Sequence, residues 1–102
     1  MINIRTIRKI EENGGLTLKN GKLVIYKTGY QVATEGVAVS TAEECIAAVR
    51  KYGGNCGVWL ENGIYYVDRS HREATKKNAI AIGKACNQIS ILKWSNMTLI
   101  YC

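Results

Sequence analysis

Proline is absent from the 102-residue chain, and no segment is low in complexity. Because 47% of the residues are hydrophobic, the chain can bury a core, and we expect a folded domain rather than a disordered segment. No hydrophobic run approaches the ~20 residues of a membrane-spanning helix, which predicts that the protein has no membrane partner. The length is typical of a single domain over residues 1–102.

Residues for acid–base catalysis are also scarce, since the sequence contains one histidine, His71, and one aspartate, Asp68. A carboxylate pair would require Asp68 with Glu61 or Glu73, and the sequence singles out neither. A cysteine–histidine nucleophile stays as a formal alternative, because distant residues can meet in a fold. We predict no catalytic residues, no cofactor and a non-enzymatic protein.

Closely spaced cysteines are missing as well. The four cysteines stand at positions 45, 56, 86 and 102, and no two form the C-x-x-C pair typical of structural zinc sites. Cys45 and Cys86 fall in predicted helices, where a free cysteine behaves as a small buried hydrophobe. We therefore predict reduced structural thiols and no metal. Reduced thiols, and a first segment without the pattern of a secretory signal, predict a cytoplasmic location.

What the sequence does contain is one short pattern that occurs three times. Segment 41–66 aligns without a gap with 75–100 at a shift of 34 positions, and the first segment aligns with the middle one at a shift of 42. In these alignments Ile4, Ile46 and Ile80 occupy the same place. Each copy is predicted to be a helix followed by two strands, an αββ unit. The predicted units are 2–27, 41–68 and 75–102, with an insertion at 28–40.

Apolar periodicity and capping residues predict one helix in each unit. The first is expected at 2–12, where isoleucines recur every third residue. The second is expected to begin at Ser40 or Thr41 and to end at Gly53-Gly54. The third is expected from Glu73 or Thr75 to Cys86, with Ser70 and Glu73 as its capping box.

Turn residues predict the strands. Asn-Gly at 20–21 and at 62–63 is the strongest short hairpin signal, because both central residues need a positive φ. Ser95-Asn96 is the expected third turn, and Glu35-Gly36 is an expected turn inside the insertion, which would add one or two short strands. The predicted fold is therefore α+β, with an antiparallel sheet of six to eight strands and three helices on one face.

The hairpin registers predict which side chains face the helices. A two-residue turn at 62–63 places Leu60 opposite Tyr65, and both should face the helices with the neighbouring Val58 and Val67. The repeat then directs Leu92, Trp94, Met97 and Leu99 of the third hairpin to the helices. It directs Trp59, Tyr66, Ile91 and Ile100 to the opposite face. Because such an apolar face is rarely left in water, we expect the insertion, a second copy of the chain or a partner to cover it.

Two groups of side chains are candidate partner-binding residues. Basic residues gather around the start of the third helix, where they oppose the helix dipole and suit a nucleic-acid phosphate or an acidic protein surface, although plain solvation explains them too. Trp59 and Tyr66, taken as a cross-strand pair beside Lys93, suit base stacking, a protein interface or a core beneath the insertion. The candidates are Arg69, Arg72, Lys76, Lys77, Trp59, Tyr66 and Lys93.

The segment ATKKNAIAIGKACNQISI (74–91) resembles small accessory modules of bacteriophages and integrative elements, in which a helix with an A-x-x-I-G core runs into an N-Q-x-S/A-hydrophobic strand. The single domain without catalytic residues also resembles the anti-CRISPR proteins of such elements. This resemblance implies stoichiometric inhibition of a host effector protein or ribonucleoprotein, such as a Cas nuclease. With a net charge of +6, an acidic protein surface or the guide RNA is a better expected target than the site of a DNA mimic. The alternative is a basic accessory module that binds RNA or DNA.

Overall fold

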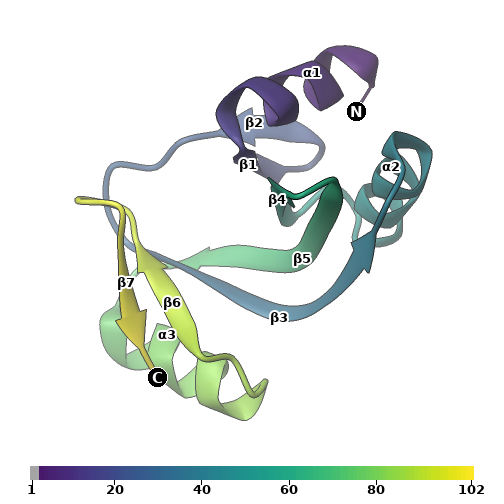
Figure 1. Ribbon diagram of the computed structural model, residues 1–102. Coiled ribbons are helices and arrows are strands. Elements are labelled where there is room, and N and C mark those ends of the chain that lie inside the picture. Colours follow the sequence, from purple (N-terminus) through teal and green to yellow (C-terminus); the bar gives the residue numbers. More distant parts are fainter. Residues whose placement is uncertain (1–2) are drawn as a thin grey trace.

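The structure, a computed structural model, describes residues 3–102 and has three helices in that range. Figure 1 shows α1 and α2 at one end of a curled sheet and α3 at the other. The helices are α1 (Ile4–Asn13), α2 (Ala42–Lys51) and α3 (Lys76–Ala85). The strands are β1 (Gly15–Lys19), β2 (Lys22–Val24), β3 (Tyr30–Val39), β4 (Cys56–Glu61), β5 (Ile64–Glu73), β6 (Ser90–Lys93) and β7 (Thr98–Tyr101).

All seven strands form one antiparallel sheet in the order β2-β1-β4-β5-β3-β6-β7. The predicted α+β fold, with three helices on one face of an antiparallel sheet, is confirmed. Each described helix has ten residues, about half of what a bilayer crossing requires.

Short polar residues begin all three helices. Asn3, Thr41 and Thr75 are the N-caps, and each side chain accepts a hydrogen bond from a backbone N–H of the first turn. The predicted start of α1 at residue 2 lies outside the described residues. The capping box predicted at Ser70 is wrong, because strand β5 continues to Glu73 and α3 begins only after Thr75.

The helices bury two separate cores against the same face of the sheet. In the first, α1 and α2 cover β1, β4 and β5, and the predicted inward residues Val58, Tyr65 and Val67 are buried there. In the second, Ala79 of α3 packs on Val32 and Ile91 from β3 and β6. The strong curl of the sheet separates these cores (Figure 1).

The insertion forms one long central strand. β3 pairs along ten residues, with β5 on one side and with β6 on the other. The predicted short strands and the turn at Glu35-Gly36 are therefore wrong. A β-bulge between Ala33 and Glu35 accommodates an extra residue, so the strand bends there without reversing. β3 thus joins the two halves of the sheet.

The third hairpin has the predicted register but the opposite facing. Ile91 pairs with Ile100 and Leu92 with Leu99, yet Ile91 is buried beneath α3, so the predicted inward direction of Leu92 is wrong. The loops before the two strands also differ. Gly53 and Gly54 both have positive φ (67° and 76°), whereas in the third unit only Asn87 does (φ 59°) and Gln88, at the place of Gly54, does not.

The order helix–strand–strand therefore occurs three times, but the structure does not confirm three equivalent αββ repeats. The second strands differ most in length, since β5 has ten residues, β2 three and β7 four.

All four cysteine thiols are free. Burial raises the pKa of Cys45 to about 11 and that of Cys56 to about 12. Because the thiolate is the nucleophilic form, both residues are unreactive packing groups at neutral pH.

Candidate binding surface and polar cavity

Trp59 and Tyr66 form the cross-strand pair that the hairpin register predicts. Asn62 and Gly63 take the positive φ values (51° and 77°) that a tight two-residue turn requires, which places the two aromatic residues directly opposite each other. Both alternate with inward residues such as Val58 and therefore lie on the sheet face away from the helices. Trp59 is 60% exposed and Tyr66 42% exposed. The sequence thus located a genuine exposed aromatic pair.

Carboxylates lie on both sides of this pair. In the β4–β5 hairpin the second pair towards the turn from Trp59 and Tyr66 is Glu61 with Ile64, and the second pair away from the turn is Gly57 with Asp68. Because alternate residues share a face, all four positions are on the same side of the sheet as Trp59 and Tyr66. We call these six residues the aromatic face. Burial raises the pKa of the Asp68 carboxyl above its ordinary value.

The insertion does not cover the aromatic face, contrary to one of the three predicted covers. β3 lies beside β5 within the sheet, where Ala38 is opposite Tyr66 and Gly36 is opposite Asp68. A Cβ on Gly36 would overlap Oδ1 of Asp68, so glycine leaves room for that carboxylate. A second copy of the chain or another partner remains a prediction.

Lys93 is not beside the aromatic pair. It is on β6, three strands from β4, and it pairs with Tyr30, whose side chain packs in the second core. Lys93 therefore lies on the helix side of the sheet. The predicted base-stacking platform next to a cation is not formed.

The two candidate arginines already have partners within the fold. Arg69 forms an ion pair with Glu35 at 3.3 Å, and its guanidinium lies 5.3 Å from the ring centre of Tyr52 on the helix side. Arg72 donates from Nε to the Thr28 carbonyl at 2.9 Å and from Nη2 to the Thr28 hydroxyl at 3.1 Å. Arg72 thereby holds the 25–29 segment against the sheet.

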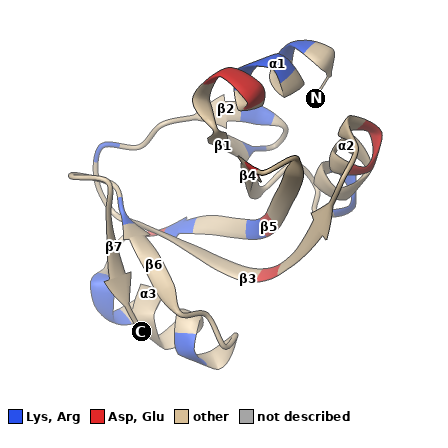
Figure 2. Ribbon diagram, viewed as in Figure 1, with Lys and Arg blue, Asp and Glu red and all other residues tan. Residues whose placement is uncertain are grey.

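Lys76 and Lys77 are exposed in the first turn of α3. Figure 2 shows this basic end of α3 in the other half of the molecule from the β4–β5 hairpin. The nearby His71 contacts Glu73 at 2.8 Å. The seven candidate residues therefore do not form one site. Trp59 and Tyr66 are paired across the β4–β5 hairpin, and the adjacent Lys76 and Lys77 lie apart from them on α3.

A polar cavity beside the first residue of β4 brings the candidate Arg72 together with residues that the sequence did not single out as binding residues. Leu18 of β1 and Arg69 of β5 both flank Cys56, the first residue of β4, so Lys19 and Ser70 follow just beyond the end of that strand. Asn55, the residue before β4, lies beside Ser70, and its backbone carbonyl accepts a hydrogen bond from the Ser70 N–H at 3.1 Å. The 25–29 segment crosses from β2 to β3 on this side. The resulting cavity encloses about 340 Å³.

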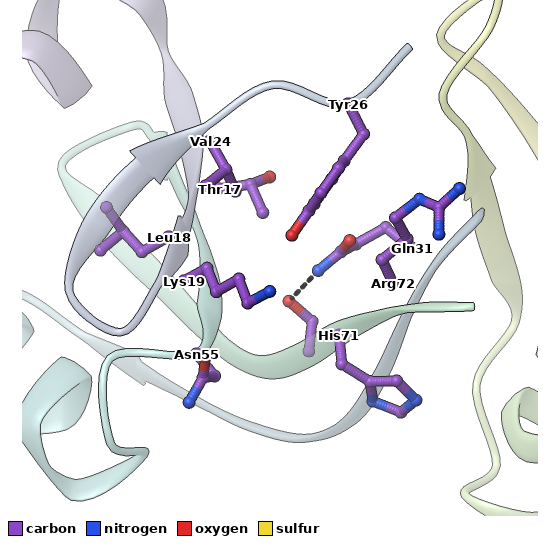
Figure 3. Close-up of a pocket in the computed structure, with 10 residues that line it drawn as sticks. Thr17, Leu18, Lys19, Val24, Tyr26, Gln31, Asn55, His71 and Arg72 are labelled. Atoms are coloured by element: carbon purple, nitrogen blue, oxygen red, sulfur yellow. Dashed lines mark hydrogen bonds between the residues drawn. The ribbon is translucent and has the colours of Figure 1, made fainter. Parts of the chain in front are cut away.

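Hydrogen bonds fix the wall of the cavity. Gln31 donates from Nε2 to the Ser70 hydroxyl at 2.9 Å and accepts at Oε1 from the Trp94 indole N–H at 3.2 Å. Tyr26 meets Trp94 edge-on, with ring centres 5.4 Å apart. Figure 3 shows the ends of Lys19, Tyr26 and Gln31 directed towards one point. No local motif could have revealed a site drawn from four distant segments.

Comparison with known protein families, characterised proteins and solved structures gives no match. Among residues 3–102, no three histidine, cysteine or acidic side chains come close enough together to hold a metal ion. The aromatic face and the polar cavity are therefore the two candidate functional sites of the described residues.

Proposed function

We propose that the protein is a stoichiometric binding protein whose aromatic face docks on a protein partner. The observation that carries this proposal is the exposed Trp59–Tyr66 pair on a sheet face that the helices leave uncovered. Tryptophan and tyrosine are the commonest anchors of protein interfaces, because a rigid ring buries a large area at a small entropic cost. Polar residues around such a centre form the rim that excludes water.

The charges next to the pair favour a protein over a nucleic acid at this face. Glu61 and Asp68 lie on either side of the rings, and carboxylates repel the phosphates that a stacked nucleotide would bring. The cation that the nucleic-acid alternative required, Lys93, lies three strands away. A partner with an apolar recess and a basic rim would complement the face instead.

This choice of partner departs from the expectation drawn from the net charge of +6, because Glu61 and Asp68, rather than the distant lysines, would meet the partner at this face. The nuclease complexes that mobile-element proteins inhibit bind nucleic acid through basic surfaces, which complement these two carboxylates. The resemblance of segment 74–91 to phage and integrative-element modules favours this class of partner. We therefore propose that the protein blocks a host defence nuclease, in the manner of an anti-CRISPR protein, by occupying such a surface. Lys76 and Lys77, far from the face, are proposed as secondary contacts only.

Truncating Trp59 should abolish most of the binding. For the Trp59→Ala variant we expect at least about a 30-fold loss of affinity for the effector complex, since truncating an anchor costs about 2 kcal/mol or more. The matched control is Tyr101→Ala, because Tyr101 is 73% exposed on β7, the edge strand in the other half of the sheet. It should change the affinity less than twofold. The measurement is biolayer interferometry with purified CRISPR effector nucleases carrying their guide RNAs.

Nuclease treatment and salt distinguish the alternatives in the same assay. Binding that survives removal of exposed nucleic acid and changes little between low and moderate salt supports a protein contact. Binding that is lost after nuclease treatment would show instead that the protein binds nucleic acid. If Trp59→Ala only converted a dimer to a monomer, the face would be an interface between two copies and the proposal would be wrong.

A further inference from the structure

We propose that the polar cavity beside the first residue of β4 binds a phosphate group, presented by a free phosphorylated small molecule or by a nucleic-acid backbone. This site is separate from the aromatic face and does not rest on the proposed function. Its position follows from the sheet. β4 begins only at Cys56, whereas the neighbouring strands β1 and β5 extend beyond that residue on either side. The volume of about 340 Å³ falls in the range of small-ligand sites.

The charge of the lining favours an anion. Lys19 and Arg72 both line the cavity, and the lining contains no carboxylate. The nearest acidic residues along β5 are Asp68, two positions before Ser70, and Glu73, which follows Arg72 and contacts His71 at 2.8 Å, and neither lines the cavity.

The donors around the cavity suit a phosphate in particular. The Lys19 ammonium and the Tyr26 hydroxyl reach the same point from opposite walls (Figure 3). Ser70 is 5% exposed, and its oxygen accepts from Gln31, so its own hydrogen can turn into the cavity as a third donor. Donors from three directions match the tetrahedral oxygens of a phosphate better than the planar pair of a carboxylate.

The walls are held before a ligand arrives. Arg72 lies 5.5 Å from the ring centre of Tyr26 and is bonded twice to Thr28, which fixes the roof of the cavity. Its guanidinium points away from the Lys19 amine in Figure 3, so we assign Arg72 a positioning role rather than a direct contact. Trp94 holds Gln31 in the same way from the other side. A preformed site of this kind needs little ordering on binding.

The test is a titration of the ¹⁵N-labelled protein with inorganic phosphate, AMP, a six-residue thymidine oligonucleotide and, as a control, acetate. We expect saturable shifts of the amide resonances of Lys19, Gln31 and Ser70 with a phosphate-bearing probe and much weaker shifts with acetate. The Lys19→Gln variant should weaken binding at least about tenfold, because it removes a charged donor. Tyr26→Phe, which keeps the ring, should weaken it about threefold to tenfold.

Lys22→Gln is the matched control. Lys22 is directly opposite Lys19 in the β1–β2 hairpin and carries the same charge, but it does not line the cavity. The Lys22→Gln change should lower the affinity for the probe by less than about twofold, because it alters only the long-range electrostatic attraction of the protein's net charge. Equal losses in the two lysine variants, equal shifts with acetate, or no saturable shift with any probe would overturn the proposal. If phosphate and AMP bind, the source is a free phosphorylated molecule. If only the oligonucleotide binds, with the same dependence on Lys19, the source is a nucleic-acid backbone.

Discussion

Replacing Gly54 with alanine should lower the free energy of unfolding by about 3 to 5 kcal/mol, which is much of the stability of a domain of this size. Gly54 has a φ of 76°, a left-handed conformation that costs a residue with a Cβ about 1 kcal/mol. Its Cβ would also overlap the backbone nitrogen of Gly21, so the β1–β2 turn must move away. That movement breaks the hydrogen bond from Gly21 N–H to the Gly54 carbonyl, 3.0 Å long, and leaves buried polar groups without partners.

Gly53→Ala separates the two causes. Gly53 has almost the same φ, 67°, but the nearest atom to its Cβ would be Nδ2 of Asn55 at 3.9 Å, an ordinary contact. This variant should therefore lose only about 1 kcal/mol. Urea unfolding of the two variants beside the parent protein provides the comparison. Equal losses would show that the close approach of the two loops does not contribute to stability.

Replacing Ile91 with alanine should cost about 3 kcal/mol, because it leaves a cavity in the small second core. Ile91 is 2% exposed and packs between Val32 of β3 and Ala79 of α3. The neighbouring Leu92 faces the other side of the sheet and is only partly buried. Leu92→Ala should therefore cost about 1 kcal/mol.

This pair of variants also tests the three-fold pattern in the sequence. The alignment places Leu92 at the position of the buried Val58, so true structural equivalence predicts the larger loss for Leu92→Ala. Thermal or urea unfolding of both variants decides between the two arrangements. A larger loss for Leu92→Ala would contradict the facing of β6 described above.

The parts of the fold that the sequence predicted correctly are those that depend on nearby residues. Ile7 and Ile10 recur on one side of α1 and are both buried. The Asn62-Gly63 turn fixes the β4–β5 register locally, and with it the opposed positions of Trp59 and Tyr66. Here propensity, capping and turn geometry agree with the tertiary structure, so short-range reasoning is sufficient.

The errors occur where distant contacts override a local signal. Glu35-Gly36 resembles a turn, but pairing with Arg69 and Asp68 of β5 holds it in one strand. Ser70 resembles a helix cap, but its hydroxyl is bonded to Gln31, 39 residues away. The polar cavity could not be predicted for the same reason, since its donors come from three strands and a crossing segment. Periodicity in a sequence contains no information about such contacts.

Hydroxyl-radical footprinting of the complex with a CRISPR effector nuclease tests directly whether the aromatic face is the partner-binding surface, because it measures the exposure of individual side chains. In the free protein Trp59, Tyr66 and Tyr101 are exposed and should be oxidised readily, whereas the buried Trp94 should not. On saturation with the effector, the account predicts that Trp59 and Tyr66 lose their reactivity while Tyr101 keeps it. A complex that forms with Trp59 still fully reactive would contradict the assignment of the aromatic face as the partner-binding surface.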